Sequence, residues 1–120
     1  MKYILLIFQN PATFEALSEA ELQGVMNEAG AIVQELQASG EWIGGEGLAD
    51  PSKARSVRAR EGVPVVTDGP YLETKEHLAG YCLFECESLE RATAIATRWP
   101  DARLTGVELR PLLSEAGTEM

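Results

Sequence analysis

The densest group of polar side chains in the sequence lies between residues 63 and 81. Asp68 stands at a turn, and Glu73, Lys75 and the only histidine, His77, follow within nine positions. A carboxyl group whose pKa is shifted by burial and by a nearby ammonium group can act as a general acid or base. The segment therefore predicts proton-transfer or elimination chemistry, with Asp68, Glu73 and Lys75 as the candidate catalytic residues.

The turn itself limits what Asp68 can do. An aspartate at a turn usually accepts a hydrogen bond from the backbone N–H two residues later, but Pro70 has none, so the carboxylate is free to face a partner. Pro70 also favours an extended Gly69, which predicts a rigid corner. If the chain stays extended beyond this corner, Glu73 and Lys75 point to the same side.

A second group of polar residues is predicted to bind the substrate. Its members are Glu46, Tyr71, His77, Glu108 and Arg110. Arg110 is suited to holding an anionic group, because a guanidinium forms paired hydrogen bonds with carboxylate or phosphate. Each residue also has a purely structural explanation, as a turn, an exposed loop side chain or a surface ion pair worth about 0–1 kcal/mol. The functional prediction therefore requires that the polar side chains converge on an enclosed cavity, with Asp68 and Glu73 facing a pocket of ~300 Å³ or more.

Two helices are expected to support this site. Ser18 and Glu21 form a capping box that starts the first helix, and Gly40 ends it. Ser88 starts the second helix, which stops before Pro100. Residues 11–17 are expected to form a loop. Two glycines, at positions 24 and 30, lie inside the first helix, and the close approach of a neighbouring segment would explain them.

The strands predict an α+β fold. They are expected at residues 2–8, 42–48, 55–60, 63–67, 80–85 and 107–112, with a two-residue turn at Glu61-Gly62. This order predicts a ferredoxin-like antiparallel sheet with both helices on one face. The central strands are apolar on both faces, so the face without helices needs a partner, and a homodimer that packs sheet on sheet supplies it. One domain is predicted at residues 1–112, followed by a flexible tail at 113–120.

Composition excludes several classes of function. The net charge of −9 argues against direct binding of nucleic acid or an anionic membrane. The longest apolar run is too short for a membrane span or a secretion signal, so a cytoplasmic protein is expected. Cys82 and Cys86 would lie ~13 Å apart on a strand, too far for a disulfide, and are predicted to be reduced core residues. No metal-ligand pattern and no cofactor motif is present, and the glycines at 44–47 lack nucleotide-binding spacing.

Several motifs resemble one family. They are Val66-Thr67-Asp68-Gly69-Pro70-Tyr71, Glu73-Thr74-Lys75-Glu76, Gly80-Tyr81, Met1-Lys2-Tyr3, Gly44-Gly45-Glu46-Gly47-Leu48 and Val107-Glu108-Leu109-Arg110-Pro111. From residue 1 to about 112 the chain resembles the DGPF family of the YCII-related superfamily, with Tyr71, His77 and Ala79 as departures from its usual residues. The resemblance implies a dimeric α/β-barrel assembly.

The resemblance leaves two classes of function open. One is an enzyme or binding protein for a small anionic or phenolic molecule. The other is a regulatory module with a protein partner, because DGPF-family proteins are often encoded beside extracytoplasmic-function sigma factors. Some relatives in the wider superfamily resemble lyases that pair a histidine with an aspartate. Since His77 is expected in a loop outside the sheet, that mechanism is not carried over.

Overall fold

The computed structural model describes residues 1–116 and contains two antiparallel sheets, one of four strands and one of two. The strands are β1 (Lys2–Gln9), β2 (Trp42–Gly47), β3 (Arg55–Arg60), β4 (Val63–Asp68), β5 (His77–Glu85) and β6 (Gly106–Pro111). The helices are α1 (Pro11–Glu15), α2 (Glu19–Ser39), α3 (Leu89–Arg98), α4 (Asp101–Leu104) and α5 (Leu113–Ala116), and η1 (Pro51–Lys53) is a short 3₁₀ turn. The predicted mixed α+β class is confirmed.

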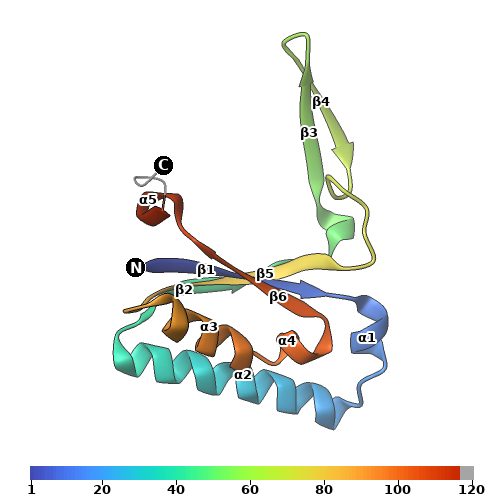
Figure 1. Cartoon of the computed structure of the whole chain (residues 1–120). Coiled ribbons are helices and arrows are strands. Elements are labelled where there is room, and N and C mark those ends of the chain that lie inside the picture. Colours follow the sequence, from blue (N-terminus) through green and yellow to red (C-terminus); the bar gives the residue numbers. More distant parts are fainter. Residues whose placement is uncertain (117–120) are drawn as a thin grey trace.

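The larger sheet has the strand order β2-β5-β1-β6, which is compatible with a ferredoxin-like arrangement. Helices α2 and α3 lie on the same side of this sheet (Figure 1). Alternate residues of β1, namely Tyr3, Leu5 and Ile7, point to this side and are buried. They pack in one core with helix residues such as Leu36 and Ile95. The period of two in β1 therefore fixes which face receives the helices.

Both long helices begin as their sequences predict. The Ser18 hydroxyl accepts a hydrogen bond from the backbone N–H of Glu21 at 3.1 Å, and the Glu21 carboxylate accepts one from the backbone N–H of Ser18. Gly40 ends α2 with a φ of 81°, in the left-handed region that glycine adopts most easily. Ser88 caps α3 by accepting from the N–H of Arg91 at 3.1 Å. These capping signals thus determine where α2 and α3, the helices that cover the sheet, begin and where α2 ends.

Two segments differ from expectation. Residues 11–15 form helix α1 instead of a loop, because the Asn10 side chain accepts from the N–H of Ala12 at 3.0 Å and Pro11 already has a helical φ. Residues 113–116 form the single turn α5 where a flexible tail was expected to begin. The rest of the predicted tail, residues 117–120, lies outside the described residues.

Helices α2 and α3 leave the second face of the larger sheet uncovered, and the single turn α5 stands on that side (Figure 1). In β1 it presents Ile4, Leu6 and Phe8, which are only half-buried. Tyr81 lies beside Leu6 and Leu83 lies beside Ile4 in the register of β1 with β5, so both share this side. We call this surface the open face. The predicted two-sided apolar character of the central strands is thus confirmed.

Strands β3 and β4 form a hairpin, here called the arm (residues 55–68). Glu61 and Gly62 have φ values of 52° and 81°, so the predicted two-residue turn is confirmed. The arm projects from the body on the side of the larger sheet opposite α2 and α3 (Figure 1). Nearly all its side chains are exposed. It therefore gives the core little support and extends a two-stranded surface into solvent.

Two glycines of α2 show whether a neighbouring segment packs closely against this helix. The expectation of a close neighbour is wrong for Gly24 and Gly30, since a Cβ at either position would meet nothing within 4 Å. Gly30→Ala is therefore expected to stabilise the fold by roughly 0.5–1 kcal/mol, by relieving the entropy cost of glycine in a helix. Urea unfolding at fixed protein concentration measures this change.

Gly45 supplies the contrasting control. A Cβ there would lie 2.6 Å from the Tyr81 carbonyl oxygen, so the backbone of β2 or β5 would have to move. Gly45→Ala is expected to lose about 1–3 kcal/mol of stability, as overpacked sites do. Equal effects of the two substitutions would contradict this account of the glycines.

Candidate functional site

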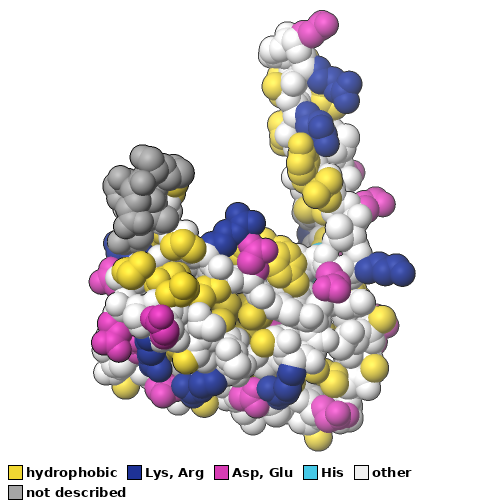
Figure 2. All heavy atoms as spheres, in the orientation of Figure 1, with side chains coloured by type: hydrophobic (Ala, Val, Ile, Leu, Met, Phe, Trp, Pro, Cys, Tyr) yellow, Lys and Arg dark blue, Asp and Glu magenta, His cyan; other side chains and the backbone are white. Residues whose placement is uncertain are grey.

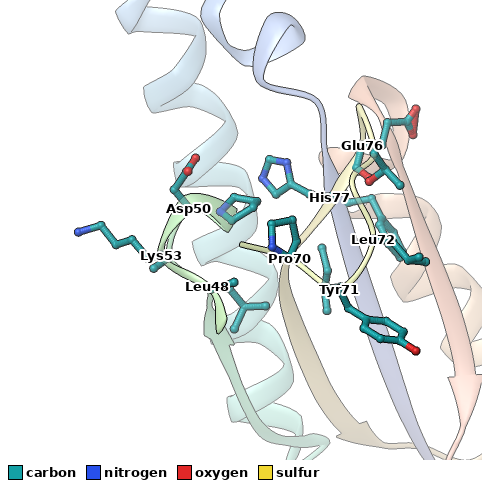
Figure 3. A pocket seen from close by; sticks show the side chains of 14 residues that line it. Leu48, Asp50, Lys53, Pro70, Tyr71, Leu72, Glu76 and His77 are labelled. Carbon is teal, nitrogen blue, oxygen red and sulfur yellow. The ribbon is translucent and has the colours of Figure 1, made fainter. Parts of the chain in front are cut away.

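A cleft of about 650 Å³, here called the corner cleft, lies where the arm joins the body. It is bounded by residues 48–54, by the loop at 70–76, and by neighbouring residues of β1 and β5. Its apolar lining comprises Phe8, Leu48, Pro51, Pro70, Leu72 and Leu78. Its main polar lining comprises Asp50, Lys53, Tyr71, Thr74, Glu76 and His77 (Figure 3). Because apolar walls with a few polar groups are typical of small-molecule sites, this cleft is the candidate functional site.

His77 and Asp50 lie at the same end of the corner cleft (Figure 3). His77 is the first residue of β5 and is paired with Gln9 of β1, so the expectation that it lies in a loop is wrong. Strand β5 begins three residues earlier than predicted, because its pairing with β1 continues through a bulge opposite Ile7 and Phe8. The imidazole is thus placed by the sheet itself.

Asp50 is held by a local turn. It caps η1, and its carboxylate accepts from the backbone N–H of Ser52 at 2.9 Å. Hydrogen bonding by the side chain and backbone of Ser52 lowers the pKa of Asp50, and the charges of His77 and Lys53 act in the same direction. The cleft therefore offers an ionised carboxylate beside its histidine.

A second hollow of about 740 Å³ adjoins the corner cleft. The two share Asp50, Pro51, Thr74 and His77, and the second hollow is also lined by Lys75 and Glu15. The His77 and Asp50 side chains thus stand between two accessible spaces. A molecule in either space could reach the imidazole.

The structure separates Asp68 from this cleft. Asp68 ends β4, its side chain is 84% exposed, and it forms an ion pair with Arg55 across the arm. Gly69 has a φ of +100°, so the expectation that Pro70 keeps it extended is wrong. Two hydrogen bonds at the base of the arm hold Gly69 in this conformation. Its N–H donates to the Ala54 carbonyl at 2.8 Å, and its carbonyl accepts from the Ser56 hydroxyl at 2.8 Å.

The other sequence-predicted residues lie in different places. Tyr71 and His77 line the corner cleft, and Lys75 lines the adjoining hollow. Glu73 is exposed in the loop at 70–76, which is irregular, so the period of two expected for Glu73 and Lys75 does not apply. Two of the predicted residues thus line the cleft and a third lines the hollow beside it.

The remaining three lie on the open face. Glu46 is beside Tyr81 on edge strand β2, whereas Glu108 is beside Leu6 on edge strand β6. Three strand spacings separate these edges, about 14 Å. Arg110 forms an ion pair with Glu108 on the same strand. The structure therefore does not bring Glu46 together with Glu108 and Arg110.

Four polar residues of the cleft were not predicted as site residues, namely Asp50, Lys53, Thr74 and Glu76. Asp50 lies between two predicted strands, at residues 42–48 and 55–60, and 27 positions separate it from His77. Because the fold brings Asp50 and His77 into the same cleft from distant parts of the sequence, no local spacing of residues could have predicted it. The one usable signal was the aspartate before Pro51 and Ser52, which indicates a capped turn and hence a fixed carboxylate.

The two cysteines take no part in this site. Cys82 and Cys86 are buried and unpaired with each other, as predicted. Burial raises the pKa of Cys82 to about 12, so its thiol stays protonated at neutral pH.

Among helices of residues 1–116, none combines the length and apolarity needed to cross a bilayer.

Comparison with known proteins places the chain in a family. The model of the YCII-related domain matches residues 1–115. A curated protein of Rhizobium meliloti (strain 1021), described as an uncharacterized protein, is 32% identical over 114 residues, which cover 93% of this chain and 92% of that protein. The narrower DGPF resemblance stays a prediction. Since both matches span nearly the whole chain, the protein belongs to the YCII-related domain family.

Proposed function

We propose that this protein binds a small phenolic or anionic molecule in the corner cleft and that His77 exchanges a proton with it. The observation that carries the proposal is the position of His77 and Asp50 together in an apolar cleft of about 650 Å³. That volume suits a single small organic molecule.

The chemistry of the lining supports this class of ligand. Phe8, Leu72 and Leu78 offer apolar contact to an aromatic ring. Lys53 in the cleft and Lys75 in the adjoining hollow supply positive charge for an anionic group. A phenol or an aromatic acid combines both features. Its acidic group would lie near His77 while its ring lies against the apolar wall.

The roles of the two central residues follow from their chemistry. A neutral imidazole takes up a proton from a weakly acidic group, and it can return that proton in a later step of an elimination. An ionised carboxylate in the same cleft favours the charge that the ring gains when it is protonated. His77 is accordingly the proposed acid–base group, and Asp50 the residue that balances its charge.

We also propose that the protein is a homodimer that packs open face against open face. Supporting this, Ile4, Leu6 and Phe8 of β1 are only half-buried on the face that α2 and α3 leave uncovered. The Glu108–Arg110 ion pair lies toward the edge of this surface, where a polar rim is expected. Stacking two such faces would give the predicted dimeric barrel.

The proposed ligand site can be tested by calorimetry with a panel of substituted phenols and benzoates. A ligand that binds the wild-type protein is expected to bind His77→Asn at least about ten-fold more weakly, because a hydrogen bond to a charged group is lost. Asp50→Asn is expected to weaken binding in the same direction. Failure of the whole panel to bind would reject this ligand class.

Asp68→Asn is the matched control, because it makes the same chemical change on the arm. It is expected to leave affinity unchanged, since Asp68 is paired with Arg55 outside the cleft. If Asp68→Asn abolished binding while Asp50→Asn did not, the site would have to be moved from the cleft to the arm.

A further inference from the structure

We infer that the arm docks on a second copy of this chain through the face that carries Val57 and Val66. This inference rests on the proposed homodimer and deepens it, because it names a contact outside the open face. Paired residues of neighbouring antiparallel strands point to the same side. Val57 pairs with Val66 and Ala59 with Pro64, so these four residues form one apolar surface, here called the valine face.

The opposite side of the arm has a different character. It pairs Arg58 with Val65 and Arg60 with Val63, and we call it the arginine face. The Arg58 guanidinium lies 4.4 Å from the centre of the Tyr71 ring, so the chain itself covers part of this side. On the valine face, Val57 is 60% and Val66 59% exposed. The valine face is thus exposed at both valines, whereas the chain itself covers part of the arginine face near Tyr71.

An isolated two-stranded hairpin is marginally stable in water and needs a surface to pack against. The chain as a whole also exposes more area than a compact monomer of its size. A compact monomer of 13.0 kDa is expected to expose about 6,300 Å². This chain exposes 8072 Å², and the difference of about 1,700 Å² exceeds the ~800 Å² per partner that a stable interface buries.

The position of the arm favours a second copy as that partner. The arm stands on the side of the larger sheet opposite the helices, which is also the side of the open face (Figure 1). Figure 2 shows hydrophobic side chains on the arm and on the body beside it. A copy stacked on the open face would therefore come within reach of the arm, and two-fold symmetry would place its own arm equivalently.

The charge distribution supports the same partner. Three of the ten basic and two of the nineteen acidic residues lie in the arm, which gives it a net charge of +1 and leaves −10 for the rest of the chain. Arm and body therefore attract each other when the arm extends over another copy, whichever side of the arm makes the contact.

The contact can be tested with a photo-crosslinking amino acid placed at single positions of the full chain. Position 57 is expected to give a crosslinked dimer in several-fold higher yield than position 63. Val63 is the matched control, because it is the same residue type, equally exposed at 62%, and on the arginine face. Mass spectrometry of the crosslinked peptides should locate the partner site on the body of the second copy.

Light scattering shows whether the protein is a dimer at all, and so it distinguishes failure of the arm docking from failure of the proposed homodimer. A dimer that crosslinks equally from positions 57 and 63, or from neither, would overturn the docking of the arm and leave the sheet-to-sheet dimer standing. A monomer would overturn both.

Discussion

Replacement of Leu6 by aspartate is expected to turn the proposed homodimer into a monomer, with a dissociation constant raised at least about 1,000-fold. Leu6 lies on β1, between Tyr81 of β5 and Glu108 of β6 on the open face. A carboxylate at this position would be buried without a partner in the dimer, at a cost of several kcal/mol. In the monomer the side chain is only half-buried, so the fold should persist.

Sedimentation or light scattering across a concentration series measures this change, and far-ultraviolet circular dichroism shows whether the variant is folded. Leu89→Asp is the matched control. Leu89 is 54% exposed at the start of α3, on the helix side of the molecule, where an acidic residue is favourable. It should leave the dimer intact. A folded Leu6→Asp variant that dimerises as tightly as the wild-type protein would exclude the open face as the interface.

Much of the fold was predictable because its signals are local. The capping box at Ser18, the terminal Gly40 and the cap at Ser88 each act within one helical turn. The alternation in β1 assigned its two faces without knowledge of any other strand. Helix α1 escaped prediction because its five residues are too short for a periodic pattern, although Asn10 and Pro11 are a recognisable start.

The candidate site was harder to predict because its parts are distant in sequence. The Asp68–Arg55 pair could have been found, since the predicted turn at Glu61 and Gly62 places residues equally far from the turn opposite each other. That register would have shown that Asp68 already has a partner. The placement of Asp50 and His77 in one cleft depends instead on an irregular loop and on the extension of β5 through a bulge.

Glu41 and Arg91 are expected to contribute the largest single polar stabilisation in the described fold. The guanidinium of Arg91 donates to both carboxylate oxygens of Glu41, at 2.8 and 3.0 Å, and joins α3 to the segment between α2 and β2. Both side chains are less than a third exposed. Glu41→Gln is expected to lower the free energy of unfolding at pH 7 by about 2 kcal/mol, because Arg91 then loses its charged partner.

The pH dependence of this effect provides a sharper test. The hydrogen bonds from Arg91 lower the pKa of Glu41 to about 2 in the folded protein, below its usual 4.5. The unfolded chain therefore takes up the proton first, and the stabilisation is complete above pH 4.5 and lost as pH falls toward 2. The stability difference between wild type and Glu41→Gln should shrink over this range.

Glu35→Gln serves as the matched control. The Glu35–Arg98 pair joins α2 to α3, and both its side chains are about half exposed, so water screens their attraction and Glu35→Gln should cost clearly less stability than Glu41→Gln. Urea unfolding of the three proteins at several pH values, at one protein concentration, compares the two pairs. If Glu41→Gln cost no more than Glu35→Gln, or if its cost did not change with pH, burial would not be the source of the stronger interaction.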